Sequence, residues 1–219
     1  MAEGELAAIL PMDISLHVTR LCLTGSSPEE LMAMTHDIDA AAALIGDVKP
    51  DLTGFHCTAV STRDPALEDD IVSRATSASS SRVVATSGAL IAAFKALDVR
   101  KIVLVTPYLD HIVASEVAFL ERHGITVLDA LGLGLNSTDE MASLDPQHWY
   151  ALTCGCMRED ADAYFLSCTA IRTLGIVEPL EAITDRPVLT SNQVMAWHLL
   201  RQAGFNETRA GFGQLLSQY

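Results

Sequence analysis

The sequence contains little positive charge and no long apolar run. Its 219 residues include 14 basic and 28 acidic side chains, which gives a net charge of −14 at pH 7. A surface of this sign repels phosphate backbones and anionic lipid, so we expect no nucleic-acid partner and no membrane partner. No stretch of about 18 residues lacks both charge and turn residues, which argues against a membrane-spanning helix. An anionic substrate would therefore need a locally positive or amide-lined pocket.

A targeting segment and a disulfide pattern are also missing. The first five residues contain no basic side chain, and the apolar stretch 6–10 is too short for the centre of a signal peptide. The five cysteines are odd in number and form no C-x-x-C motif, so we expect free thiols. Together these features predict a cytoplasmic protein. With 49% hydrophobic and 19% charged residues, the chain has the composition of a globular domain with a sizeable core.

Strand-like and helix-like patterns alternate along the chain. The expected strands are 51–58, 82–85, 101–106, 125–131, 163–168 and 187–190. The expected helices are 27–46, 65–75, 88–97, 110–123, 146–158, 176–183 and 192–203. Short apolar runs separated by helices are typical of parallel strands that are buried on both faces. The sequence therefore predicts an α/β fold with a mostly parallel sheet, flanked by helices.

A repeat divides this pattern into two similar halves. Phe55-His56-Cys57-Thr58-Ala59-Val60 is similar to Leu166-Ser167-Cys168-Thr169-Ala170-Ile171, and the two cysteines lie 111 residues apart. Farther along, Thr86-Ser87 and Thr190-Ser191 each follow a strand and open a helix. We expect an N-terminal half over 1–98 and a C-terminal half over 99–195, with the C-terminal helix 196–219 returning to the first half and the active-site cleft between them.

Both repeated cysteines come at the carboxyl end of a strand, where ligands bind in open parallel sheets. Nearby helix N-termini and backbone amides are expected to lower the pKa of such a thiol and favour the reactive thiolate. Hydroxyl and N–H groups at the same edge are suited to hold a carboxylate; they come from Thr58, Thr86, Ser87, Thr169, Thr190 and Ser191. The alternative is that Cys57 and Cys168 are small core residues, which the repeated context disfavours.

A Cys-Gly-Cys segment, a Gly-Leu-Gly segment, one histidine and one tyrosine are further candidates for a functional role. Cys154-Gly155-Cys156 has no second pair at metal-ligand spacing, so we expect no metal site. Gly132-Leu133-Gly134 lacks a third glycine and is interpreted as a turn. His56 either tunes the neighbouring thiolate or, as strand alternation favours, packs on the opposite face. Tyr108 follows Thr106-Pro107 at a strand end, where its hydroxyl can donate to a carboxylate.

Several segments together resemble the maleate isomerase and arylmalonate decarboxylase branch of the aspartate/glutamate racemase superfamily. They are Cys57-Thr58, Thr86-Ser87-Gly88-Ala89-Leu90, Leu104-Val105-Thr106-Pro107-Tyr108, Ser167-Cys168-Thr169, Pro179-Leu180-Glu181 and Pro187-Val188-Leu189-Thr190-Ser191-Asn192-Gln193. The resemblance covers about residues 12 to 216. It implies two pseudo-symmetric α/β halves, a small carboxylate substrate and no metal or cofactor.

The resemblance also implies a role for each matched residue. The decarboxylases have glycine in place of the first cysteine, whereas this chain has both cysteines, as racemases and maleate isomerases do. Cys57 would then add to the double bond of a cis-enedioate, and Cys168 would be its acid/base partner. The residues expected to bind the substrate through hydroxyls or backbone amides are Thr58, Ala59, Thr86, Ser87, Tyr108, Thr169 and Ala170.

Two departures from the family pattern leave alternatives open. The family begins with a strand and a Pro-Ser-Ser-Asn loop, which residues 1–10 lack, so we expect that strand to be absent. Ala59 and Ala170 also replace polar side chains. The preferred function is a cofactor-independent, maleate-type isomerase. The alternatives are an aspartate/glutamate-type racemase, an arylmalonate-type decarboxylase, or a catalytically impaired relative that binds a carboxylate. A homo-oligomer is expected.

Overall fold

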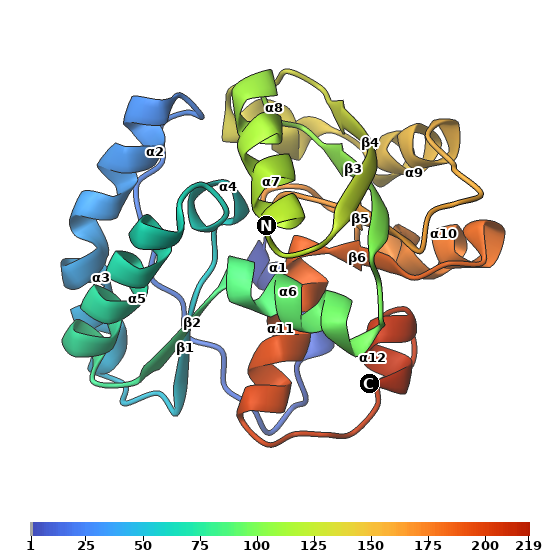
Figure 1. Ribbon diagram of the computed structural model, residues 1–219. Helices are drawn as coiled ribbons and strands as arrows, with labels where there is room; N and C mark the ends of the chain where they lie inside the picture. The colour runs from blue at the N-terminus through green and yellow to red at the C-terminus, as the bar shows by residue number, and fades with distance from the viewer. Residues whose placement is uncertain (1) are drawn as a thin grey trace.

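The computed structural model describes residues 2–219, which form helices and short strands in alternation (Figure 1). The strands are β1 (Leu52–Phe55), β2 (Arg82–Ala85), β3 (Lys101–Thr106), β4 (Thr126–Gly132), β5 (Ala163–Leu166) and β6 (Val188–Thr190). The α-helices are α1 (Ala2–Ile9), α2 (Pro28–Met34), α3 (Ile38–Gly46), α4 (Thr58–Ser61), α5 (Pro65–Ser79), α6 (Thr86–Ala96), α7 (Asp110–Arg122), α8 (Thr138–Ser143), α9 (Pro146–Gly155), α10 (Val177–Thr184), α11 (Ser191–Gln202) and α12 (Gln214–Gln218). Two 3₁₀ turns complete them, η1 (Thr35–Asp37) and η2 (Leu174–Ile176).

The strands form two parallel sheets. In the first, β1 pairs with β2, and in the second the order is β4-β3-β5-β6. Helices cover both faces of the second sheet, which confirms the predicted α/β class. No helix among residues 2–219 is both long and apolar enough to cross a membrane.

Local sequence signals account for several element boundaries. Ser27 caps α2 and forms a reciprocal capping box with Glu30, as the sequence predicts. The helix expected to continue to Gly46 is instead interrupted by η1, so that α2 and α3 are separate. Gly124, with φ +79°, ends the region of α7 in the left-handed conformation that glycine favours. The predicted strands at 82–85 and 101–106 match β2 and β3 at both ends.

The first strand along the described chain is β1, and the residues before it are helical or irregular. Residues 2–9 form α1, which packs against α11, and residues 15–25 form no helix or strand. The sequence did not predict α1. The expected absence of a strand in residues 1–10 agrees with this helix for residues 2–9, and Met1 lies outside the described residues.

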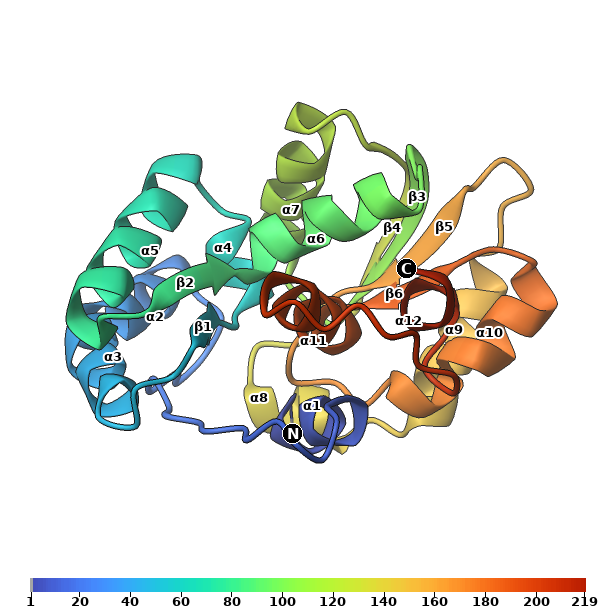
Figure 2. The same ribbon diagram turned by 90° about the horizontal axis from the view of Figure 1, so that it is seen from below.

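Two hydrophobic clusters form the core. One joins β1 and β2 to one face of the second sheet, and the other joins the opposite face of that sheet to α6 and α11. In the second cluster, Phe94 of α6 meets Phe165 of β5 edge to face, with ring centroids 6.0 Å apart. Figure 2 shows α6 and α11 side by side between the two sheets.

The helix α11 also approaches β1 closely. A Cβ atom at Gly54 would lie only 3.3 Å from the Met195 sulfur, so this glycine allows the close packing of α11 against β1. Beyond α11 the chain turns back, and α12 places Leu215 and Leu216 in the cluster of the second sheet. The division into 1–98 and 99–195, with 196–219 returning to the first half, stays a prediction.

Candidate active site

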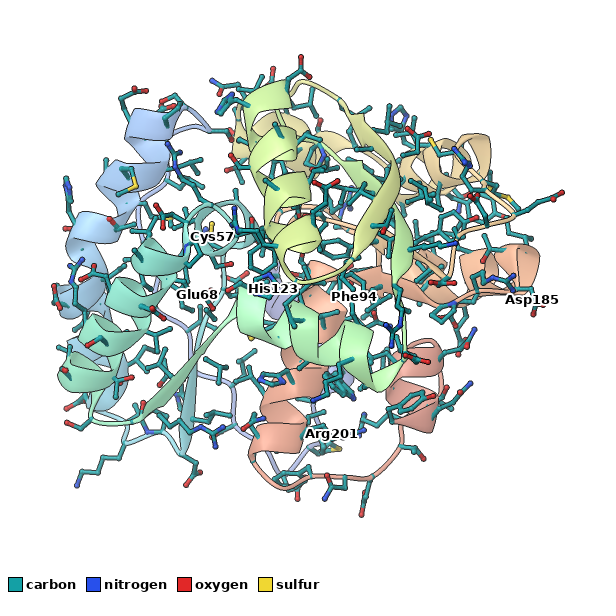
Figure 3. The ribbon with its side chains drawn as sticks, in the orientation of Figure 1. Cys57, Glu68, Phe94, His123, Asp185 and Arg201 are labelled. Carbon is teal, nitrogen blue, oxygen red and sulfur yellow. The ribbon has the colours of Figure 1, made fainter. Side chains whose placement is uncertain are left out.

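The two repeated cysteines lie at the carboxyl ends of β1 and β5. Cys57 follows β1 and is the N-cap residue of α4, and Cys168 follows β5. The strand expected to continue through Thr58 ends at Phe55, because the chain turns there into α4. Figure 3 shows Cys57 beside α4, at the side of the first sheet that faces α7.

Cys57, Cys168 and Tyr108 form one group, in which Cys168 and Tyr108 are buried and Cys57 is partly exposed. The three side chains lie close enough to interact electrostatically, and Tyr108 and Cys168 each act on the pKa of the other. Cys168 is 4% exposed, and its sulfur accepts a hydrogen bond from the Ala170 N–H at 3.2 Å. Backbone hydrogen bonds from Ala59 and Val60 act on Cys57. The structure thus brings together the two thiols and the tyrosine that were predicted from the sequence as site residues.

The pKa values of both thiols run opposite to the expectation. Burial raises the pKa of Cys57 to about 11 and that of Cys168 to about 12, because an ionised thiol loses hydration. The backbone hydrogen bonds at Ala59, Val60 and Ala170 lower these pKa values, but by less than burial raises them. The expectation that the helix N-termini lower the thiol pKa is therefore wrong in its net direction. Burial also raises the pKa of Tyr108, so its hydroxyl remains a donor at neutral pH.

Ser191, at the start of α11, connects the two cysteine segments. Its Oγ accepts hydrogen bonds from the Thr58 hydroxyl at 2.8 Å and from the Cys168 N–H at 3.1 Å. At α6, the Ser87 N–H donates to the Ser61 Oγ at 3.2 Å, while the buried Ser87 hydroxyl has no partner among residues 2–219. Ser191 therefore couples the position of Cys168 to that of α4, and Ser87 has a free polar group.

We predict that Ser191→Ala destabilises the fold. The substitution removes the acceptor of two buried donors, the Thr58 hydroxyl and the Cys168 N–H, at a cost of about 2–4 kcal/mol. Urea unfolding measures this loss as a lower midpoint with an unchanged slope. The matched control is Ser77→Ala, which removes an exposed hydroxyl that bonds only to a carbonyl of its own helix. Equal midpoints for the two variants would contradict the bridging role.

His56 belongs to a hydrogen-bonded chain that crosses the two halves of the sequence. Its Nδ1 lies 3.1 Å from the Thr86 Oγ1, and its Nε2 lies 2.8 Å from the Asn192 Oδ1. The Asn192 amide donates to Glu5 Oε2 at 2.7 Å, which ties α1 to α11. Burial lowers the pKa of His56 to about 4, so the ring is neutral at physiological pH. The structure therefore supports the interpretation of His56 as a packed residue.

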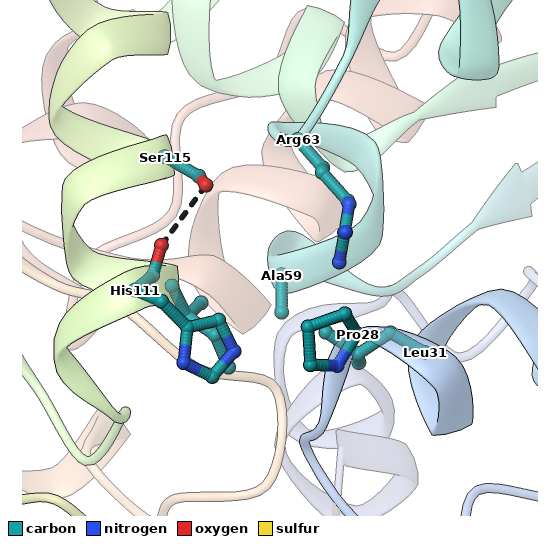
Figure 4. Close-up of a pocket in the computed structure, with 7 residues that line it drawn as sticks. Pro28, Leu31, Ala59, Arg63, His111 and Ser115 are labelled. Atoms are coloured by element: carbon teal, nitrogen blue, oxygen red, sulfur yellow. Dashed lines mark hydrogen bonds between the residues drawn. The ribbon is translucent and has the colours of Figure 1, made fainter.

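A cavity of about 910 Å³ opens beside Cys57. Its walls include β1, residues 13–21, and Thr169 and Ala170 from the second cysteine segment. A separate cavity of about 220 Å³ lies between α2, α4 and α7. Figure 4 shows that Ala59 and Arg63 border it from one side and His111 from the other. Of the predicted binding residues, Thr58, Thr86, Ser87 and Tyr108 are buried around the thiols, while Thr169 and Ala170 reach the larger cavity.

The remaining cysteines do not join this group. All five are free; Cys22 is exposed, and Cys154 and Cys156 lie at the end of α9. No three or more His, Cys, Asp or Glu residues within 2–219 are grouped so as to hold a metal ion. The expected turn at Gly132-Leu133-Gly134 is not found: Gly132 is the last residue of β4, and the Gly134 N–H donates to the distant Tyr108 carbonyl.

Sequence reasoning missed Glu5, Asn192 and Glu116. Glu5 also accepts the Thr173 and Leu174 N–H groups at 2.8 Å, so it supports the loop that follows Cys168. Glu116 is fully buried and accepts a hydrogen bond from the Ser167 hydroxyl at 2.5 Å. A signal for Glu116 was present, because it lies four residues after Ile112 on the apolar face of α7.

Two parallel sheets, with a thiol at one strand end of each and a tyrosine beside them, define a class of α/β protein with paired cysteines. The family model for arylmalonate decarboxylase matches residues 4–216, and the chain belongs to this family. This confirms the resemblance found in the sequence.

Several similar proteins are maleate isomerases. The chain is 29% identical to a maleate isomerase of Nocardia farcinica, over 99% of this chain and 90% of the relative. It is 26% identical to a maleate isomerase of Pseudomonas putida, over 96% of this chain and 87% of the relative. A solved structure of a mutant Nocardia farcinica maleate cis-trans isomerase, with a covalently bound succinylcysteine intermediate, superposes with a TM-score of 0.92 at 27% identity, covering 100% of this chain and 94% of that one.

Proposed function

We propose that this protein is a cofactor-independent isomerase that converts a maleate-type cis-enedioate to its trans isomer. The observation that carries the proposal is the group of Cys57, Cys168 and Tyr108, which follow the carboxyl ends of β1, β5 and β3. Relatives named maleate isomerase, one of them with a covalently bound succinylcysteine, support the same chemistry. The five free cysteines fit the cytoplasmic location that the sequence predicts.

The reaction uses one thiol as nucleophile and the other as acid and base. The Cys57 thiolate forms a C–S bond to one alkene carbon, and the π electron pair takes the Cys168 proton at the other carbon. The resulting C–C single bond rotates. The Cys168 thiolate then removes a proton from the same carbon, the double bond re-forms, and the C–S bond breaks to release Cys57 as thiolate. Atoms and charge balance without an oxidant, a reductant or a metal.

Neutral donors around the thiols hold the substrate carboxylates in this proposal. The Tyr108 hydroxyl keeps its proton because burial raises its pKa, and the Ser87 hydroxyl is buried without a partner. The Thr169 backbone amide completes the set of proposed donors. The hydroxyls of Thr58 and Thr86 already donate to Ser191 and to the Phe55 carbonyl, so they support the site from behind. The Ala59 and Ala170 amides already act on the two sulfurs. Hydrogen bonds from such donors to a carboxylate stabilise its charge where few cations are available.

Conversion of maleate to fumarate, followed by absorbance, tests the proposal. We expect turnover by the purified protein that is unchanged by EDTA, because the steps use only thiols and hydrogen bonds. Loss of activity in EDTA that is restored by a divalent metal would contradict the two-thiol mechanism.

The same assay separates the alternative functions. Exchange of the α-proton of aspartate or glutamate in heavy water would indicate a racemase, and release of carbon dioxide from an arylmalonate would indicate a decarboxylase. Saturable binding of a dicarboxylate without turnover would favour a catalytically impaired relative. The raised pKa of Cys57 is the observation that keeps this last alternative open. A homo-oligomer remains a prediction, which the molar mass from sedimentation or light scattering would test.

A further inference from the structure

Glu116 is an acidic side chain in the core of the second half. It lies on α7, has 0% exposure, and accepts a hydrogen bond from the Ser167 hydroxyl through Oε1 at 2.5 Å. Its other oxygen, Oε2, has no hydrogen-bond partner among residues 2–219. Burial raises the pKa of Glu116 to about 7, although the Ser167 hydrogen bond acts in the opposite direction. A buried carboxyl group without a cation costs stability, which makes a functional role worth testing.

The position of Glu116 links it to one cysteine. Ser167, which holds Glu116, directly precedes Cys168 in the chain. The titratable groups that interact with Glu116 are Cys168 and Tyr108, and a charge on Glu116 raises the pKa of both. On β4, against which α7 packs, Asp129 is exposed to solvent. The other charged residues of α7, namely Asp110, His111, Glu121 and Arg122, are also exposed.

Among residues 2–219, no carboxyl group contributes to the pKa of Cys57, whereas Glu116 contributes to that of Cys168. The residue before Cys57 is His56, a neutral ring held by Thr86 and Asn192. The repeat therefore places similar thiols in two halves that differ by one buried carboxyl group. Because ionisation of Cys57 raises the pKa of Cys168, a first thiolate on Cys57 disfavours a second one on Cys168. Burial is the largest cause of the raised pKa of Cys168, and a charge on Glu116 raises that pKa further, so ionised Glu116 favours the thiolate at Cys57.

We propose that Glu116, held by Ser167, is a positioning residue that places negative charge beside Cys168, and so assigns the thiolate to Cys57 and the proton-donor role to Cys168. This assignment of roles rests on the proposed isomerase function. Glu116 breaks the symmetry of the pair without touching the substrate. Its charge opposes a second negative charge on Cys168, whereas Cys57 lies next to a neutral ring.

The test measures alkylation of each cysteine in the folded protein. Iodoacetamide labelling of wild type and Glu116→Gln is followed by mass spectrometry from pH 6 to 9.5. Above pH 8 we expect Cys168 in Glu116→Gln to react about fivefold faster, because a nearby negative charge has been removed from the thiolate. Cys57 should change less. At pH 6 the two proteins should agree, since Glu116, with a pKa of about 7, is already protonated in the wild type.

Two further variants make the result decisive. Glu121→Gln removes an exposed carboxylate from the same helix and should behave as wild type. Ser167→Ala removes a hydrogen bond that lowers the pKa of Glu116, so Cys168 should react faster than in wild type just above pH 7 and approach the wild-type rate at higher pH. A gain that is equal at pH 6 and pH 9, or shared with Cys154 and Cys156, would indicate loosened packing and overturn the proposal. An unchanged Cys168 rate would overturn it too. If the wild type fails to convert maleate, the proposed function is wrong, but the alkylation rates still show whether Glu116 acts on Cys168.

Discussion

Cys57→Ser lowers conversion of maleate to fumarate to the uncatalysed background, whereas Cys168→Ser retains measurable turnover. Cys57 must attack carbon and later leave, and a serine hydroxyl is a much poorer substitute for a thiolate at neutral pH. Cys168 transfers a proton, for which water or a neighbouring hydroxyl can partly substitute. Its loss should therefore cost about 10²–10⁴-fold, the range typical of general acid–base catalysis.

The difference in lost turnover between Cys57→Ser and Cys168→Ser tests the assignment of the two roles. Absorbance assays at one pH compare wild type, Cys57→Ser, Cys168→Ser and the control Cys22→Ser, which changes an exposed thiol and should retain full activity. Circular dichroism checks that each variant is folded. Equal losses at both cysteines, accompanied by α-proton exchange with aspartate or glutamate, would replace the isomerase by a two-base racemase. A larger loss at Cys168 than at Cys57 would reverse the assignment of the nucleophile.

The sequence predicted the second sheet well because its strands carry strong local signals. At β3, Lys101 precedes an apolar run and Pro107 follows it, and the strand is buried as predicted. At β1 the prediction was too long, because the chain turns into α4 immediately after Cys57. Helix α1 was missed since its eight residues carry only a weak amphipathic pattern, and its packing against α11 supplies the missing stability.

The candidate site was predicted in its residue types but not in its electrostatics. Cys57, Cys168 and Tyr108 could be found because each follows a strand within a recognisable motif. Their pKa values depend on burial by segments distant in the chain, which no local pattern contains. The same holds for Glu116, since its contact with Ser167 joins residues 51 positions apart. Spacing in the sequence therefore locates the thiols, and three-dimensional packing sets their reactivity.

The reaction rate should rise steeply with pH through the neutral and mildly alkaline range. Burial places the pKa of Cys57 at about 11, so near pH 7 only about one molecule in 10⁴ carries the thiolate. Below that pKa, each pH unit increases the thiolate fraction about tenfold. We therefore expect kcat/KM for maleate to rise by about 10²-fold between pH 7 and pH 9.

Measurement of kcat/KM at half-unit intervals from pH 7 to 9.5 checks this slope. The ionisation of His56 does not change the stability of the fold within this pH range. Its pKa falls from 6.5 to about 4 on folding, so its contribution to stability is present above pH 6.5 and is lost as the pH falls toward 4. The alkylation rate of Cys57 should follow the same slope as turnover, since both depend on the same thiolate. A plateau in turnover above pH 7.5, with alkylation still rising, would mean that substrate binding itself provides the thiolate, and that burial of Cys57 in the free protein does not limit the rate.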